Sequence, residues 1–133
     1  MAVVTRITVT GQKKIATLQR EFTEKFPYLG LRLFSEEEWQ KSQRGETIRA
    51  LAADQTIAKV RTKEHGEPIS IHGRTKVSTL EGQFRQRYGL NCQVIVHKKG
   101  AKSKSYTSVD MDSVGLTELN RRLEASGEYQ PPT

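Results

Sequence analysis

The sequence predicts an α+β protein in which one βαββα unit occurs twice. Residues 7–26 and 69–88 align without a gap, and six of these twenty positions are identical. Chance would give about one identity, because even common residues make up only ~7% of a chain. The chain has 133 residues, and a repeat of about 55 residues is near the lower limit for folding alone. We therefore expect the two copies to pack together, with two semi-independent modules as the alternative.

Each copy begins with a short strand that leads into an amphipathic helix. Residues 7–9 and 69–71 alternate β-branched and polar side chains, which is typical of a strand with one buried face. A glycine follows each strand, Gly11 or Gly73, and we expect a turn with positive φ there. The next apolar residues recur at steps of three and four, which predicts one buried helical face. They are Ile15, Leu18, Phe22 and Phe26 in the first copy and Val77, Leu80, Phe84 and Tyr88 in the second.

The remainder of each copy predicts two more strands and a short helix. We expect the three strands of each copy to form a small mixed sheet that its helices cover on one face. Asp54 and Ser113 are the expected N-caps of the last helices. The second strand is expected at 29–34 and 92–96, the third at 47–51 and 106–110, and the last helix at 54–60 and 113–119.

The predicted domain organisation follows these units. A polar segment with Gly and Pro separates the copies and reads as a linker, and the last residues contain two prolines and are expected to be loose. The first repeat is predicted at 1–62, the linker at 63–68, the second repeat at 69–125 and the tail at 126–133.

The repeat resembles that of a family of small two-repeat bacterial proteins. The resemblance covers nearly the whole chain, except a glutamate-rich insertion in the first copy and a lysine-rich one in the second. No activity is known for that family, so the resemblance implies the duplication and no site. In the second copy it rests on Ile71-His72-Gly73-Arg74-Thr75-Lys76, Val77-Ser78-Thr79-Leu80, Phe84, Tyr88-Gly89 and Gln93-Val94-Ile95-Val96, and in the first on Thr17-Leu18, Phe22, Phe26 and Leu31-Arg32-Leu33.

The chain is basic, with a formal net charge of +7, which favours polyanionic partners. We expect a non-enzymatic binding protein that contacts nucleic-acid backbone, without sequence preference, through basic helix starts and the lysine-rich connector 97–105. The alternatives are a solvated hairpin loop and a solvated helix face with intrahelical ion pairs. The candidate residues are Lys14, Arg74, Lys76, Arg85, Arg87, Lys98, Lys99, Lys102 and Lys104.

An acidic insertion in the first copy supports a different function. Ser35 and Glu38 have the spacing of a capping box, which predicts a short extra helix. The insertion could also bind a protein partner, or the basic connector of a second molecule, and Trp39 could recognise a partner or cover an end of the core. A protein–protein regulator that uses this insertion or an exposed strand edge is therefore the alternative function. Its candidate residues are Glu36, Glu37, Glu38 and Trp39.

No pattern in the chain predicts an enzyme, a metal or a cofactor. The only cysteine, Cys92, lies on the expected inner face of a strand, and the three histidines are scattered. Asp110 and Asp112 could hold a cation, but no further ligand stands beside them in the sequence. No apolar run approaches the roughly 18 residues of a membrane span, and no leader is evident. We expect a cytoplasmic protein, monomeric or weakly self-associating, with no membrane partner.

Overall fold

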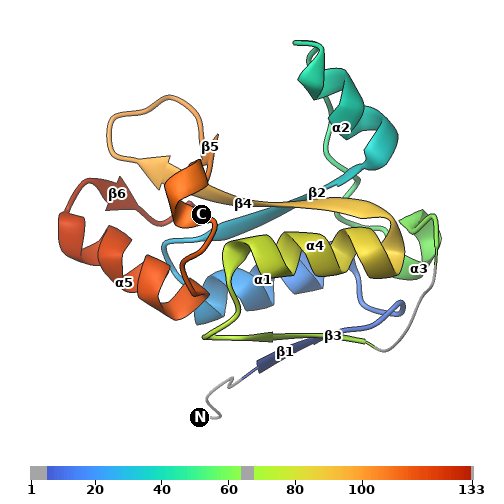
Figure 1. Cartoon of the computed structure of the whole chain (residues 1–133), viewed down its shortest axis with the longest axis horizontal. Coiled ribbons are helices and arrows are strands. Elements are labelled where there is room, and N and C mark those ends of the chain that lie inside the picture. The colour runs from blue at the N-terminus through green and yellow to red at the C-terminus, as the bar shows by residue number, and fades with distance from the viewer. Residues whose placement is uncertain (1–5, 64–67, 133) are drawn as a thin grey trace.

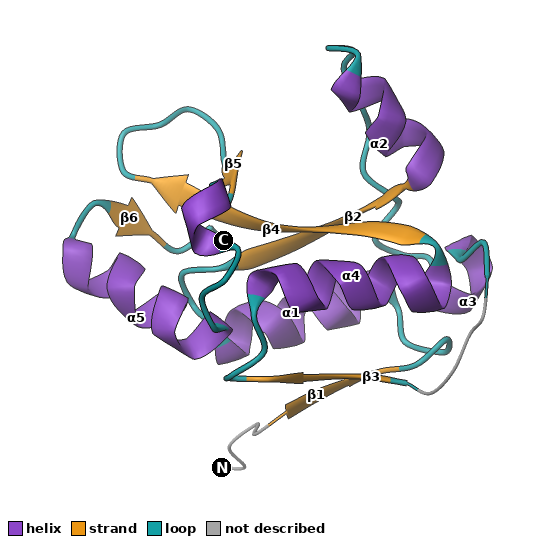
Figure 2. Ribbon diagram, viewed as in Figure 1, coloured by secondary structure: helices purple, strands orange, loops and turns teal. Residues whose placement is uncertain are grey.

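The computed structural model of the protein describes residues 6–63 and 68–132. It is a mixed α/β fold, 40% helical and 25% strand, which confirms the predicted α+β class. Two antiparallel sheets enclose a layer that consists of helices α1 (Ile15–Lys25) and α4 (Val77–Tyr88), as Figures 1 and 2 show. None of the helices in the described part of the chain is long and apolar enough to cross a membrane.

Both sheets combine strands from the two halves of the chain, so the prediction of one mixed sheet per copy is wrong. In each half the first strand lies on one side of the layer of α1 and α4 and the second strand on the other side, as Figure 1 shows. These first and second strands pair with the corresponding strands of the other half, and every strand pair in the two sheets is antiparallel. β1 (Arg6–Val9) pairs with β3 (Ile69–His72), β2 (Gly30–Ser35) pairs with β4 (Leu90–Lys98), and β4 also pairs with β5 (Ser105–Tyr106) and β6 (Tyr129–Gln130).

The register of the strands directs apolar side chains from both halves into one core. Ile7 lies opposite Ile71 and Val9 opposite Ile69, and all four side chains are buried against the helix layer. A single buried cluster contains these residues together with the inner faces of α1, α4, β2 and β4. The alternative of two semi-independent modules is therefore wrong. The boundaries at 1–62, 63–68, 69–125 and 126–133 stay predictions, because 64–67 lie outside the described residues.

Equivalent backbone hydrogen bonds hold the starts of α1 and α4. The first two N–H groups of α1 and of α4 donate to carbonyls of a segment that follows later in the same half, so these helix donors are satisfied by backbone. The N–H groups of Ile15 and Ala16 donate to Gln55 and Ala53 (2.9 and 2.8 Å), and those of Val77 and Ser78 donate to Val114 and Asp112 (3.3 and 2.9 Å).

Because of these contacts, the last helix of each half begins two residues later in the chain than the sequence predicted. The N-caps of α3 (Ile57–Val60) and α5 (Leu116–Ser126) are Thr56 and Gly115. The predicted N-caps, two residues earlier at Asp54 and Ser113, are wrong because the residues at these positions belong to the segments that bind the starts of α1 and α4.

Gly11 and Gly73 each allow close approach of another segment, and the positive φ expected for them is wrong, because neither adopts it. A Cβ at Gly11 would lie 2.7 Å from Arg61 Nη1 and 3.3 Å from Ala58 Cβ, and one at Gly73 would overlap the Thr117 hydroxyl. The carbonyls of the two glycines accept hydrogen bonds from Ala58 and Thr117 (2.7 and 2.8 Å). The first turn of α5 therefore packs against Gly73 with no room for a Cβ beside Thr117, whereas at Gly11 the closest atom is the flexible end of Arg61.

The predicted third strands are absent or short. Residues 47–51 form no strand, and only the Leu51 N–H bonds to β2, at Leu33 C=O (2.9 Å). In the second half β5 has two residues and leads into a single 3₁₀ turn, η1 (Val109–Met111). In that half the strand stops early because Ser108 donates to the Asp110 carboxylate (2.6 Å), a local turn contact.

The tail predicted to be loose is ordered up to Pro132, the last described residue. Helix α5 ends at Gly127, which has a φ of 70°, a conformation that glycine adopts without strain. This turn returns the chain to β4, where β6 pairs with His97 and Lys98. Pro132 is buried, so the C-terminal residues complete one end of the four-stranded sheet.

Candidate functional site

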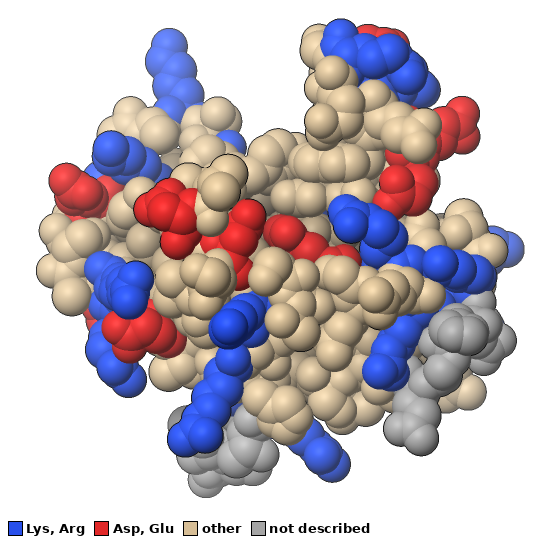
Figure 3. Space-filling model, viewed as in Figure 1, with Lys and Arg blue, Asp and Glu red and all other residues tan. Residues whose placement is uncertain are grey.

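The basic residues predicted to bind nucleic acid lie in separate parts of the structure. Lys14 and Lys76 correspond in the repeat, and each is the N-cap residue of its helix. They bridge to Thr56 beside α3 and to Gly115 beside α5, and Figure 1 shows α3 and α5 at opposite ends of the molecule. Figure 3 likewise shows basic side chains at several separate places on one face. Arg74 is exposed close to Lys76, so those two residues share one end.

The starts of α1 and α4 offer no free N–H group at their first two residues. An anion at a helix start binds to N–H groups that have no partner within the helix. In α1 and α4 the first two of these groups already donate to backbone carbonyls. Lys14, Arg74 and Lys76 can therefore offer charge to a partner, but they lack free N–H groups from the first two helix residues beside them.

Arg85 and Arg87 lie in the last turn of α4 and not in the zone of Lys76. A cation at this end of a helix interacts favourably with the helix dipole. Arg85 Nε is 3.6 Å from Glu36 Oε1, and Arg87 Nη1 donates to Pro68 C=O (3.1 Å). Both arginines therefore have stabilising contacts within the protein.

The lysine-rich connector forms the turn between β4 and β5. Lys98, Lys99 and Lys102 are exposed, whereas Lys104 is half-buried. No ion pair among the described residues involves any of these four lysines. Lys104 also lines a groove on the outer face of the four-stranded sheet, together with Arg32 of β2.

This groove, of about 580 Å³, runs along the edge of β2 between α1 and the C-terminal prolines; we call it the β2 groove. Pro27, Ile95, Pro131 and Pro132 give it apolar surface, and three cations stand around it. Arg20 is 3.8 Å from Glu24, whereas Arg32 and Lys104 have no ion pair in the described part of the chain. The β2 groove is therefore apolar with two uncompensated positive charges.

Arg32 was not among the candidate residues identified from the sequence, although the alternation of apolar residues around it predicts an outward position. Leu31 and Leu33 alternate with it and are buried on the inner face of β2. Since successive side chains of a strand point to opposite faces, this alternation places Arg32 on the outer face. The groove itself could not be predicted, because it depends on α1 and on the C-terminal residues reaching β2.

The edge of β2 is closed to an added strand at one of its carbonyls and at the carbonyl just before it. Gln19 Nε2 donates to Leu31 C=O (3.0 Å), and Thr23 Oγ1 donates to Leu29 C=O (3.2 Å). Strand addition needs such carbonyls as acceptors. This edge is therefore a poor site for the strand-pairing partner considered from the sequence.

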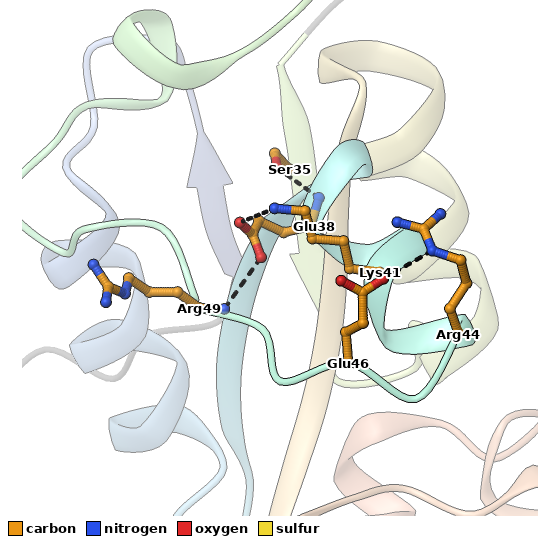
Figure 4. Close-up of polar contacts among 6 residues, drawn as sticks. All are labelled: Ser35, Glu38, Lys41, Arg44, Glu46 and Arg49. Carbon is orange, nitrogen blue, oxygen red and sulfur yellow. Dashed lines mark hydrogen bonds and ion pairs between the residues drawn. The ribbon is translucent and has the colours of Figure 1, made fainter.

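The acidic insertion forms a helix, as the capping pattern predicted: α2 (Glu36–Gln43) begins after Ser35, whose Oγ accepts the Glu38 N–H (3.1 Å). Figure 4 shows the Glu38 carboxylate between Lys41 Nζ (3.3 Å) and the Arg49 N–H (3.4 Å). Glu36 accepts from Asn91 Nδ2 (3.2 Å), and Glu37 is exposed. Two of the three glutamates thus have partners within the protein.

Trp39 belongs to an aromatic cluster that consists of Phe34, Trp39 and Tyr106. The Trp39 ring centroid is 5.5 Å from that of Phe34 and 5.5 Å from that of Tyr106. Phe34 is 2% exposed and Tyr106 is 41% exposed. Trp39 itself is half-buried, so it covers the outer face of the sheet beside α2 and leaves Tyr106 as the accessible ring of the cluster.

Glu81 on α4 is a titratable group that the sequence did not reveal. Partial burial and then the negative charge of Asp112 raise the pKa of Glu81 to about 7, against the opposing effects of a hydrogen bond from the Val94 N–H and the charge of Arg85. Burial, and then Glu81, raise the pKa of the neighbouring Cys92 thiol. A buried, protonated thiol is not an activated nucleophile. Within 6–63 and 68–132 no three His, Cys, Asp or Glu residues gather as a metal site would require.

Comparison of this chain with protein-family models, with curated proteins and with solved structures found no match. The resemblance of its repeat to small two-repeat bacterial proteins therefore stays a prediction.

Proposed function

We propose that the protein is a non-enzymatic binding protein that contacts nucleic-acid backbone beside the β4–β5 hairpin. The observation that supports this is one group of cations without ion pairs in the described part of the chain. We call them the hairpin cations, and they are Lys98, Lys99, Lys102, Lys104 and Arg32.

Several basic residues elsewhere in the described part of the chain, unlike the hairpin cations, have acidic partners. Arg121 and Arg122 both contact Glu118 (2.9 and 3.2 Å), and Lys41 contacts Glu38 (3.3 Å). Uncompensated like charges on one short hairpin repel one another. Phosphates would remove this repulsion and would release bound counterions, which gives affinity without base recognition.

Fluorescence anisotropy with labelled duplex DNA and single-stranded RNA tests the proposal. Binding should weaken by an order of magnitude or more between about 50 and about 200 mM salt. The test variant replaces the four hairpin lysines by Gln, and the control replaces Lys41, Arg44, Arg121 and Arg122 by Gln, which changes the net charge equally. The test variant should lose most of the salt dependence and the control little of it. Equal losses, or no binding at the lower salt, would contradict the proposal.

A second candidate, a protein–protein module, is supported by the aromatic cluster, because Tyr106 leaves 41% of its surface exposed at the rim of the sheet. Aromatic side chains are enriched at the centres of protein interfaces. Under this function Trp39→Ala or Tyr106→Ala should abolish capture of a protein partner. Replacing the hairpin lysines should leave that capture unchanged.

A further inference from the structure

The β2 groove has the size and surface of a small-ligand site. Its volume of about 580 Å³ lies within the ~300–1,000 Å³ of typical ligand pockets. Its apolar lining consists of the exposed Pro27 and Pro131 and of the buried Gly30, Ile95 (5% exposed) and Pro132. A Cβ at Gly30 would lie 2.8 Å from Ile95 Cγ1 and 3.3 Å from Pro132 Cγ, so these two side chains pack directly onto the Gly30 backbone and close the floor of the groove. Such a floor suits a planar, weakly polar ring.

One wall of the groove carries a fixed polar group. Gln19 lines the β2 groove, and its amide is held in place because Nε2 donates to Leu31 C=O (3.0 Å). The amide has a second N–H and a carbonyl oxygen besides this bond. A held amide presents a donor and an acceptor together, which is the pattern that reads the edge of a nucleobase.

The charges of the groove favour an anionic group at one side of the ring. Arg32 lies opposite Gln93 on β4, two residues from the Gly30–Ile95 pair and on the same face of the sheet, and Lys104 comes from the connector just before β5. Both cations line the groove together with Ile95. Glu24 stands with Arg20 on the α1 side, so a phosphate is favoured on the side of Arg32 and Lys104.

From this arrangement we infer that the β2 groove holds one unstacked nucleotide of a single-stranded nucleic acid, an inference that rests on the proposed function. The base lies against the exposed prolines Pro27 and Pro131, and its phosphate contacts Arg32 and Lys104. The strand continues from the groove toward Lys99 of the hairpin. A duplex keeps its bases paired and would have to extrude one to fill the groove, at a cost of a few kcal/mol that a single strand avoids.

The test compares two lysines of the same hairpin. Lys104→Gln removes a charge that lines the β2 groove, whereas Lys102→Gln removes an equal charge outside it. The probes are a fluorescein-labelled oligodeoxythymidine of about twelve nucleotides, within the usual range of site sizes, and a duplex of the same length. Lys104→Gln should weaken single-strand binding about tenfold or more, as expected for one lost hydrogen bond between charged groups. Lys102→Gln should weaken it much less, and the two variants should affect duplex binding equally.

Amide chemical shifts supply a second measurement that does not depend on a variant. Adding the oligodeoxythymidine to labelled wild-type protein should shift the amides of Gly30, Leu31 and Ile95. The amides of Val9 and Ile71 in the other sheet should stay unchanged.

The outcomes separate this inference from the proposed function. If neither probe binds at low salt, both fail. If both probes bind, but Lys104→Gln and Lys102→Gln are equivalent and the Gly30 and Leu31 amides do not move, the proposed function stands and the groove inference is wrong. If decanoate shifts these amides and the oligonucleotide does not, the groove takes an apolar acid, and the inference is also overturned.

Discussion

Gln19 on α1 and Glu81 on α4 occupy corresponding positions, and each side chain bonds to the backbone of the strand beside its helix. Gln19 Nε2 donates to Leu31 C=O (3.0 Å), whereas the Glu81 carboxylate accepts from the Val94 N–H. Gln19 is neutral at every pH. Glu81 must place its negative charge in a half-buried site near Asp112, so the same position is titratable in only one half.

The replacement Glu81→Gln should remove a pH dependence of stability. The pKa of Glu81 is raised to about 7 in the folded state, so between its unfolded pKa and about pH 7 the folded protein binds more protons than the unfolded chain. Its contribution to stability is therefore present at low pH and is lost as the pH rises to about 7. Because Glu81 is partly exposed, the effect should be on the order of 1 kcal/mol, well below the full conversion of the pKa shift.

Thermal unfolding at pH 5 and pH 8 measures this effect. The Tm of Glu81→Gln minus the Tm of the wild type should be larger at pH 8 than at pH 5. Glu124→Gln, at an exposed position of α5, is the control and should show no such change. A constant difference between Glu81→Gln and wild type would show that Glu81 titrates normally.

The replacement Gly73→Ala should destabilise the protein through a specific overlap. The new Cβ would meet the Thr117 hydroxyl, and forcing extra atoms into a close contact costs about 1–3 kcal/mol. Urea unfolding of the single variant and of Gly73→Ala with Thr117→Ala measures the coupling. The second change removes the hydroxyl and should restore most of the loss. Without such recovery, close packing against Thr117 is not the reason for this glycine.

The replacement Gly82→Ala should have the opposite sign. Gly82 lies inside α4, and a Cβ there would meet no atom within 4 Å. Glycine in a helix interior costs about 0.8–1 kcal/mol relative to alanine. The midpoint of urea unfolding should therefore rise with an unchanged slope. A lower midpoint would indicate that α4 needs flexibility or free space at this position.

Neither half of the chain should fold as a separate fragment. Fragments 1–62 and 63–133 each lack the partner strands of both sheets, since β1 pairs with β3 and β2 with β4. Circular dichroism with thermal unfolding should show no cooperative transition for either fragment, whereas the whole chain unfolds in one. A cooperative transition in one fragment would restore the two-module organisation.

The sequence predicted the buried faces well and the strand pairing poorly. Leu18, Phe22, Leu80 and Phe84 recur at helical spacing, and all are buried in the core. Periodicity records which face of an element is buried but not which strand lies beside it, so it could not show that Ile7 pairs with Ile71. The duplication also stays a prediction, supported by the matching hydrogen bonds at the starts of α1 and α4.

The candidate site was predicted in part. The hairpin lysines were identified because charge density is visible in a sequence, but Arg32 and the β2 groove depend on segments that meet only in the fold. Arg85 and Arg87 were grouped with Lys76, although nine to eleven residues of helix, at about 1.5 Å per residue, separate them. Sequence proximity within a helix is a poor guide to a shared surface.

Because β1 pairs with β3 and β2 with β4, neither sheet can form until the second half of the chain has been synthesised. β1 and β2 are made early, but their hydrogen-bonding partners begin only at Ile69 and Leu90. A ribosome adding roughly 5–20 residues per second needs about 2–7 s to make residues 63–98. Throughout that interval, side chains of the first half such as Phe22 lack the core residues of the second half that they pack against. This chain therefore folds late in translation, and a chaperone that binds apolar segments has time to hold it first.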